Sequence, residues 1–179
     1  MDVSIVIPTK NGGNLFDEVL TAIDQQKTKY SFEVICVDSG SSDQTIETIK
    51  KHHCILKQIP KEEFGHGKTR NLGASLGTGE YIIFITQDAK PASNKWLENF
   101  INAMKLDESV VGGFGIHYPY PDCNLLDKRD LYYHFKGFGE DNTIYYLEDK
   151  ERYNNEEGYR HLLSFFSDNN SCLKRSIWE

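Results

Sequence analysis

Residues 81–91 (YIIFITQDAKP) constrain the fold more than any other segment of the sequence. Five apolar residues follow one another without alternation, which predicts a strand covered on both faces within a parallel sheet. The strand ends on polar residues, and Asp88 stands just beyond its end. Ligands of open α/β sheets bind beyond the carboxyl ends of the strands, so Asp88 is a candidate ligand for a hard cation that holds phosphate oxygens. The alternative is that Asp88 only caps the turn before Pro91.

The length and composition exclude several classes of protein. A chain of 179 residues suits one domain, or one domain with an insertion, and a hydrophobic fraction of 39% is enough for a core. The net charge of -7 argues against a nucleic-acid partner, which would need a basic face, but it allows a nucleotide ligand. No apolar run approaches the ~20 residues that span a bilayer, and the N-terminus lacks the basic and apolar regions of a signal peptide.

The spacing of the four cysteines fits no zinc or redox motif. They are Cys36, Cys54, Cys123 and Cys172. Cys36 lies within an apolar run, so we expect it to be a small core residue. We therefore expect a reducing, cytoplasmic setting. Any contact with the membrane is expected to be peripheral, at its inner face, or made by segments outside this sequence.

Apolar runs alternate with helical patterns along most of the chain. Strands are predicted at residues 3–7, 32–37, 54–59, 81–85, 110–116 and 162–166. Asn14 is expected to cap the first helix, with Asp17 in its first turn. Apolar residues recur at helical spacing in residues 96–104, and Leu72 and Leu76 are expected to form the buried side of another helix. This order of elements predicts an α/β fold, with a mostly parallel sheet between two layers of helices.

Polar loops follow the first two predicted strands. Residues 8–13 (PTKNGG) and 38–43 (DSGSSD) each join a strand to a helix, and Asp43 is expected to cap the second of these helices. Carboxylates and hydroxyls at the ligand end of a sheet suit a nucleoside, because a carboxylate accepts hydrogen bonds from ribose hydroxyls or from a base N–H. The alternative is that both segments are ordinary turns.

A third polar loop, at residues 64–73 (FGHGKTRNLG), leads into a predicted helix. Its glycines let the backbone turn closely around a ligand. Lys68 and Arg70 stand where the helix begins, a position that favours anions. The alternatives are that Arg70 is a solvated surface charge and that His66 is an ordinary loop histidine.

Residues 117–160 differ in character from the rest of the chain. They are rich in Tyr, Asp and Glu, with one helical pattern near residues 125–135. We expect an insertion over the sheet that faces a second substrate. Some of its aromatic residues can stack on sugar rings, and the alternative is that they form the core of the insertion: Tyr118, Tyr120, Tyr132 and Tyr133. A new helix starts just before Glu179, which favours a chain truncated at its C-terminus.

Five motifs occur in order along the sequence. They are VSIVIPTKN at 3–11, VDSGSSDQT at 37–45, FGHGKTRN at 64–71, TQDA at 86–89 and FSDNNS at 166–171, the last followed by Lys174, Arg175 and Trp178. Together they resemble the family 2 glycosyltransferases with the GT-A fold, and within them the rhamnosyltransferase-type branch. The resemblance implies one GT-A domain over residues 1–179, a three-layer α/β/α sandwich. Its nucleotide-binding half would span residues 1–116, with an insertion on the acceptor side at 117–160.

The resemblance also implies an activity. It implies transfer of a sugar, with rhamnose as a candidate, from a nucleoside-diphosphate donor to a saccharide or lipid-linked saccharide of a bacterial surface polysaccharide, with inversion at the anomeric carbon. The nucleotide would contact Pro8, Thr9, Asn11, Asp38, Ser39, Arg70, Asn71 and Gln87. Asp88 would bind Mg²⁺ or Mn²⁺, which bridges the diphosphate. The side facing the donor sugar and the acceptor would hold His66, His117, Asp168 and Asn169.

Three departures from the family pattern bear on this reading. The usual D-x-D motif begins with an acid, whereas this chain has Thr86, so metal binding depends on Asp88. The rhamnosyltransferase-type branch often has Arg-Gln where Ile116 and His117 stand, which leaves the donor sugar open. The general base that activates the acceptor hydroxyl usually follows the last residue of this chain. Asp168 is the candidate within the chain, and we expect donor binding with poor or no turnover.

Two other functions are alternatives. A non-catalytic nucleotide-binding or scaffolding module of the same fold is favoured by Thr86 and by the missing base. It is disfavoured by the retained Asp38, Arg70, Asn71 and Asp88. A dinucleotide-dependent dehydrogenase is disfavoured because no G-x-G-x-x-G follows the first strand.

Overall fold

The computed structural model describes residues 1–139 and 141–179. These residues form two compact units, the first made of residues 1–113 and 168–179 and the second of residues 114–167. The predicted insertion at 117–160 lies inside the second unit. No helix in the described parts of the chain is both long and apolar enough to cross a bilayer.

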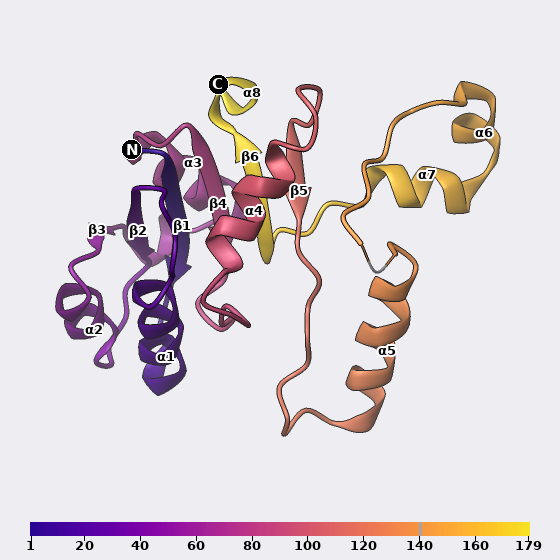
Figure 1. Ribbon diagram of the computed structural model, residues 1–179. Helices are drawn as coiled ribbons and strands as arrows, with labels where there is room; N and C mark the ends of the chain where they lie inside the picture. Colours follow the sequence, from indigo (N-terminus) through magenta and orange to yellow (C-terminus); the bar gives the residue numbers. More distant parts are fainter. Residues whose placement is uncertain (140) are drawn as a thin grey trace. The chain divides into compact units, whose positions relative to one another are not determined.

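The first unit is built on a six-stranded sheet (Figure 1). Its strands are β1 (Val3–Thr9), β2 (Phe32–Asp38), β3 (Ile55–Gln58), β4 (Tyr81–Ile85), β5 (Gly112–Phe114) and β6 (Asn170–Lys174), in the order β3-β2-β1-β4-β6-β5. The strands β1 to β4 are parallel to one another, whereas β6 runs antiparallel to β4. The prediction of a mostly parallel sheet is therefore confirmed.

Helices cover both faces of this sheet. They are α1 (Gly13–Asp24), α2 (Thr45–Lys51), α3 (His66–Leu76), α4 (Trp96–Met104) and the short α8 (Arg175–Trp178), and a 3₁₀ turn at Lys61–Glu63 precedes α3. Side chains from α1, α2 and α4 share one core cluster with Ile83 and Ile85 of β4. Ile82 and Phe84 belong to a second cluster, against α3 and Trp178. Successive residues of β4 thus face opposite layers, which explains its unbroken apolar run.

The buried side of α3 differs from the prediction. Leu72 is only partly buried and Leu76 is 39% exposed, whereas Gly73 and Ala74 are buried. A Cβ on Gly73 would lie 2.3 Å from Cγ1 of Val6. The helix therefore packs its small residues against the sheet, because only they allow such a close approach.

The start of α1 also differs from the prediction. The helix begins at Gly13 with Gly12 as its N-cap, and its first turn holds no acid, so the assignments of Asn14 as the cap and of Asp17 to the first turn were wrong. Residues far along the chain bind the helix start instead. The N–H of Gly12 donates to the hydroxyl of Thr45 at 2.8 Å, and that of Gly13 donates to the carboxylate of Asp43 at 3.0 Å.

Two of the later predicted strands change. The strand at 110–116 shortens to β5. The strand predicted at 162–166 is wrong, because residues 162–164 end a helix, α7 (Glu157–Ser164), and residues 165–166 follow it. Tyr159, Leu162 and Leu163 are half-buried at positions i, i+3 and i+4, the spacing of one helix face. A short apolar run is compatible with a strand or with a helix, so the run at 162–166 alone could not distinguish the two.

The second unit has an aromatic core. Its helices are α5 (Leu125–Lys136), α6 (Lys150–Asn155) and α7. The ring of Phe114 lies 5.2 Å from that of Phe138 and 5.1 Å from that of Phe165, both edge to face. Asn124 caps α5 by accepting from the N–H groups of two residues in its first turn.

Candidate functional site

The carboxyl edge of the parallel strands gathers most of the predicted site residues. The loops after β1, β2 and β4 all leave the sheet at this edge. Because β6 is antiparallel and pairs Asn170 with Ile85, its first residues reach the same edge. Asp168 and Asn169 were expected to follow a strand. They precede one instead, and the reversed direction of β6 still brings them to the end of β4.

The loops after β1 and β2 are bound to each other through Asn11. Its side-chain oxygen accepts from the N–H of Ser42 at 2.8 Å, and its own N–H donates to the hydroxyl of Ser41 at 2.8 Å. Asn11 has a φ of 48°, in the left-handed region that asparagine tolerates better than most residues. Together with the bonds from Gly12 and Gly13, these contacts hold the two loops as one polar surface.

Asp38 organises the second of these loops. Asp38 is fully buried. Its carboxylate accepts hydrogen bonds from the N–H groups of Gly40 and Ser41, at 3.0 Å each, and from the hydroxyl of Ser41. The hydroxyl of Thr9 lies 3.4 Å away, and Ser39 is also buried. In this arrangement the carboxylate shapes the loop, and its contact with a base or ribose stays a prediction.

Asp43 holds the end of that loop. It accepts from the hydroxyl of Thr45 at 2.5 Å and from the N–H of Thr45 at 3.0 Å. The hydroxyl bond is the main reason why the pKa of the Asp43 carboxyl is lowered. Asp43 was expected to cap α2. The N-cap residue is Gln44 instead, but the carboxylate of Asp43 still accepts from the N–H of Thr45, the first residue of the helix.

Asp88 lies in a turn at the end of β4. The N–H of Ala89 donates to the carbonyl of Thr86 at 3.2 Å, so Gln87 and Asp88 are the central residues of the turn, and Asp88 is exposed. The side-chain amide of Gln87 bonds to both main-chain groups of Lys10. Thr86, which replaces the first acid of a D-x-D motif, donates its hydroxyl to the side-chain oxygen of Asn169.

The segment before β6 is fixed to two helices. Asp168 approaches Arg70 of α3 to 3.2 Å between carboxylate and guanidinium, and Asn170 accepts from the indole N–H of Trp96 of α4 at 2.9 Å. The side chain of Arg70 is only 9% exposed, and its Nε has no hydrogen-bond partner among the residues that the structure describes. The role of Asn170 was not predicted from the sequence, where its only signal was its place in a polar tract.

The remaining predicted residues are more scattered. Pro8 is half-buried at the end of β1, and Asn71 is exposed on α3. His66 is exposed at the start of α3, where its ring contacts Phe64 edge to face. His117 belongs to the second unit, where its Nε2 lies 3.0 Å from the hydroxyl of Ser167 and its ring packs on Phe135.

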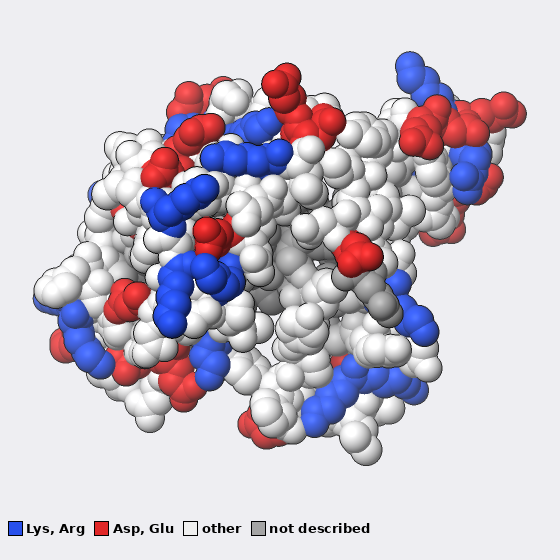
Figure 2. Space-filling view, viewed as in Figure 1, with Lys and Arg blue, Asp and Glu red and all other residues white. Residues whose placement is uncertain are grey.

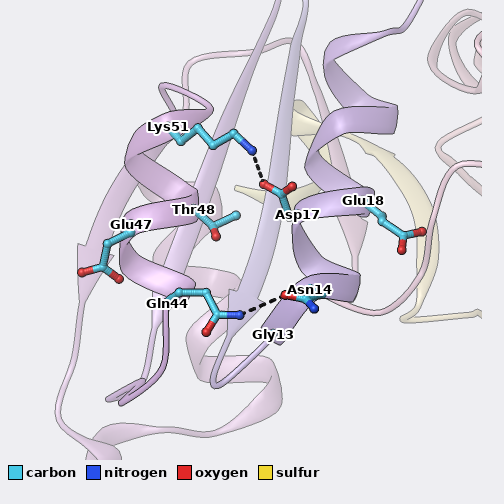
Figure 3. Close-up of a pocket in the computed structure, with 8 residues that line it drawn as sticks. All are labelled: Gly13, Asn14, Asp17, Glu18, Gln44, Glu47, Thr48 and Lys51. Atoms are coloured by element: carbon cyan, nitrogen blue, oxygen red, sulfur yellow. Dashed lines mark hydrogen bonds and ion pairs between the residues drawn. The ribbon is translucent and has the colours of Figure 1, made fainter.

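A pocket on the first unit lies away from these residues (Figure 3). It lies between α1 and α2, and none of the predicted site residues lines it. An ion pair of 2.8 Å between Lys51 and Asp17 crosses it, as does a hydrogen bond of 3.2 Å between Gln44 and Asn14. The polar edge of the sheet remains the better candidate site, because several loops converge there.

Charges on the visible surface are mixed. Figure 2 shows basic and acidic side chains interspersed over the face in view. Within residues 1–139 and 141–179, no group of three or more His, Cys, Asp or Glu side chains is arranged to hold a metal ion. A cation at the polar edge of the sheet would therefore be held by Asp88 and by oxygen atoms of the molecule bound there.

Comparison with known proteins identifies the family. The family described as "Glycosyl transferase family 2" matches residues 4–176, nearly the whole chain. The chain belongs to this family. The resemblance to its rhamnosyltransferase branch is confirmed by the O-antigen chain rhamnosyltransferase RfbN of Salmonella typhimurium, which is 37% identical over 128 residues. That alignment covers 70% of this chain and 40% of RfbN, so this family 2 chain spans less than half of its relative.

Solved structures of similar proteins support the fold assignment. The mannosyltransferase PcManGT from Pyrobaculum calidifontis, in complex with GDP-Man and Mn²⁺, has a TM-score of 0.63 and 19% identity over 98% of this chain and 45% of that chain. TarS residues 1–349 from S. aureus, in complex with UDP, has a TM-score of 0.51 and 27% identity over 58% of this chain and 32% of that chain. The family 2 chain therefore has the GT-A fold that the resemblance implied.

Proposed function

We propose that this family 2 chain is the donor-binding part of an inverting glycosyltransferase of bacterial surface polysaccharide synthesis. It would bind a nucleoside-diphosphate sugar, with rhamnose as the first candidate, and pass the sugar to a saccharide or lipid-linked saccharide. The observation that carries this proposal is the meeting of the loops after β1, β2 and β4 at one edge of the sheet, in a chain of this family. The similarity to RfbN supports rhamnose.

The donor would lie across this edge. The loops after β1 and β2, with Thr9, Asn11, Asp38 and Ser39, would bind the base and ribose, and Asp88 would be on the diphosphate side. Ligands bind at this edge in other open α/β sheets, and the structure of TarS residues 1–349 in complex with UDP is that of a similar protein with a nucleoside diphosphate.

Asp88 suits a divalent cation. Mg²⁺ usually keeps several waters and binds through one or two carboxylates plus the phosphates of a substrate, and an exposed single carboxylate in a turn can serve in that way. Mg²⁺ or Mn²⁺ bound there would stabilise the charge that develops on the departing diphosphate. We assign no general base among the described residues, because the carboxylate of Asp168 is already paired with Arg70.

A second function, a nucleotide-binding module without transfer activity, is favoured by one observation. Thr86 stands in place of an acid, so this position supplies no negative charge to a cation, and its hydroxyl donates to the side-chain oxygen of Asn169. Such a module would bind the donor nucleotide in the same place. It would differ from the enzyme by the absence of sugar transfer when an acceptor is supplied.

Calorimetric titration tests the proposal. The protein is titrated with UDP, dTDP and GDP, with Mn²⁺ and with EDTA, and the same titrations are made on Asp88→Ala. Asp107→Ala is the control, since Asp107 is an exposed acid in a turn after α4. We expect metal-dependent binding of one nucleotide, lost in Asp88→Ala and kept in Asp107→Ala. No binding of any nucleotide, or equal binding by Asp88→Ala, would contradict the proposed site.

A further inference from the structure

The side chain of Gln87 forms a two-point bridge to the loop after β1. Its Nε2 donates to the carbonyl of Lys10 at 3.0 Å, and its Oε1 accepts from the N–H of Lys10 at 2.8 Å. One side-chain amide therefore satisfies both main-chain groups of a residue 77 positions away, as the backbone of a neighbouring strand would.

The bridge continues the sheet where β4 has stopped. β1 and β4 pair in register from Val3 with Tyr81 to Val6 with Phe84. β4 ends at Ile85 and the chain then turns at Thr86, whereas β1 runs on to Thr9. Beside Lys10, just after β1, the side-chain amide of Gln87 makes the hydrogen bonds that a continued β4 would make. It therefore sets the distance between the turn that carries Asp88 and the loop after β1.

Further hydrogen bonds extend the connection to the loop after β2. Lys10 is followed by Asn11, whose N–H donates to the hydroxyl of Ser41, and that hydroxyl donates to the carboxylate of Asp38. A continuous path of bonds thus runs from the turn of Asp88 to the loop expected to bind the base. Gln87 is the link in this path that joins the two sides.

We propose that Gln87 is a positioning residue that couples the metal-diphosphate subsite to the base subsite, and that it does not itself contact the nucleotide. This inference rests on the proposed function. In a nucleoside diphosphate, covalent bonds fix the separation of base and diphosphate. Both ends add to the affinity in full only if the protein holds the two subsites at that separation.

The coupling can be measured as a ratio of affinities. For the nucleotide that the protein binds, Kd of the nucleoside monophosphate in EDTA is divided by Kd of the nucleoside diphosphate with Mn²⁺. Gln87→Ala removes both bonds to Lys10. Gln87→Glu keeps the size and one acceptor but places a carboxylate against the Lys10 carbonyl. We expect both variants to lower the ratio about tenfold or more, with monophosphate affinity nearly unchanged.

Gln26→Ala is the matched control. Gln26 also bonds to main-chain groups, of three residues in its case: it donates to the carbonyls of Ala22 and Ser93 and accepts from the N–H of Leu97 at 3.0 Å. It lies just beyond α1, in a different set of contacts from the three loops. We expect its loss to lower Tm as Gln87→Ala does, without changing the ratio.

The possible outcomes separate the two proposals. An unchanged ratio in Gln87→Ala, while the wild-type protein binds its nucleotide with Mn²⁺, would overturn the coupling role and leave the proposed function standing. An equal fall of the ratio in Gln26→Ala would also overturn it, because general loss of stability would then explain the effect. A wild-type protein that binds no nucleotide would overturn the proposed function, and this inference with it.

Discussion

The guanidinium of Arg70 and the carboxylate of Asp168 lie 3.2 Å apart, and the two partners differ in burial. The side chain of Arg70 is 9% exposed and that of Asp168 is 75% exposed. The same guanidinium also donates to the main-chain carbonyls of Asp168 and His66. Most of what Arg70 contributes therefore comes from its bonds to the main chain rather than from the exposed ion pair.

The two partners should differ in their effect on stability. We expect Asp168→Asn to lower the free energy of unfolding by less than about 1 kcal/mol, because exposed ion pairs contribute little. Arg70→Met should cost about 1–3 kcal/mol, because it removes the guanidinium that donates to the main-chain carbonyl of Asp168 and the second donor to the carbonyl of His66. Urea denaturation of both variants measures the difference, and equal losses would contradict this division of roles.

Asp168 should also be dispensable for catalysis of sugar transfer. Loss of a general base typically lowers the rate by about 10²–10⁴-fold. In a form of the protein that transfers sugar, we expect Asp168→Asn to keep its rate within about tenfold of wild type, since its carboxylate is already paired with Arg70. Steady-state rates with donor and acceptor test this. Abolished transfer in Asp168→Asn, beside robust transfer by residues 1–179, would make Asp168 the base after all.

Gly73 should tolerate no side chain. An added Cβ would lie 2.3 Å from Cγ1 of Val6 and 3.2 Å from Cγ2 of Val37, both in the sheet below α3. We expect Gly73→Ala to lower the free energy of unfolding by about 1–3 kcal/mol through overpacking. Gly67→Ala is the control in the same helix, because a Cβ there meets nothing within 4 Å.

The control variant Gly67→Ala should not lose stability. Alanine favours a helix more than glycine does, so Gly67→Ala should be neutral or stabilising by up to about 1 kcal/mol. Thermal and urea unfolding of both variants give the comparison. Similar destabilisation by both would show that α3 does not approach the sheet as closely as the structure indicates.

Glu33 should give the fold a defined dependence on acid pH. Partial burial raises the pKa of its carboxyl, but hydrogen bonds from the main chain of Thr78 and from the hydroxyls of Ser4 and Thr78 outweigh that effect, so the pKa is lowered overall. A carboxyl whose pKa is lower in the folded state stabilises the protein above its unfolded pKa of about 4.3, and that stabilisation is lost as the pH falls through the folded value.

The test compares Glu33→Gln with wild type across this range. We expect wild type to lose stability relative to Glu33→Gln between about pH 5 and pH 3, because the amide cannot be protonated there. Glu62→Gln, at an exposed position of the 3₁₀ turn, should follow the wild-type curve. Parallel curves for wild type and Glu33→Gln would contradict the lowered pKa.

Much of the fold follows from local features of the sequence. The unbroken apolar run of β4 indicated a strand covered on both faces, and the structure divides that run between two core clusters. The helical spacing of apolar residues in 96–104 predicted a helix there, and α4 spans Trp96–Met104. The polar residues after β1, β2 and β4 marked the edge where the loops meet. These features depend on hydrogen bonding and burial within one element, so the sequence by itself could determine them.

Tertiary structure decided the direction of β6 and the partners of the polar side chains. The run at 162–166 fitted a strand or a helix; residues 162–164 form the end of α7, and Phe165, just after it, packs its ring against Phe114. Gln87 bonds to Lys10 across 77 positions, and Arg70 to Asp168 across 98. Such partners are chosen when separate elements pack together, because a buried polar group must find whichever acceptor or donor the folded chain brings near it. The sequence thus located the carboxyl edge of the sheet as the site, and packing decided which residues hold the loops of that edge together.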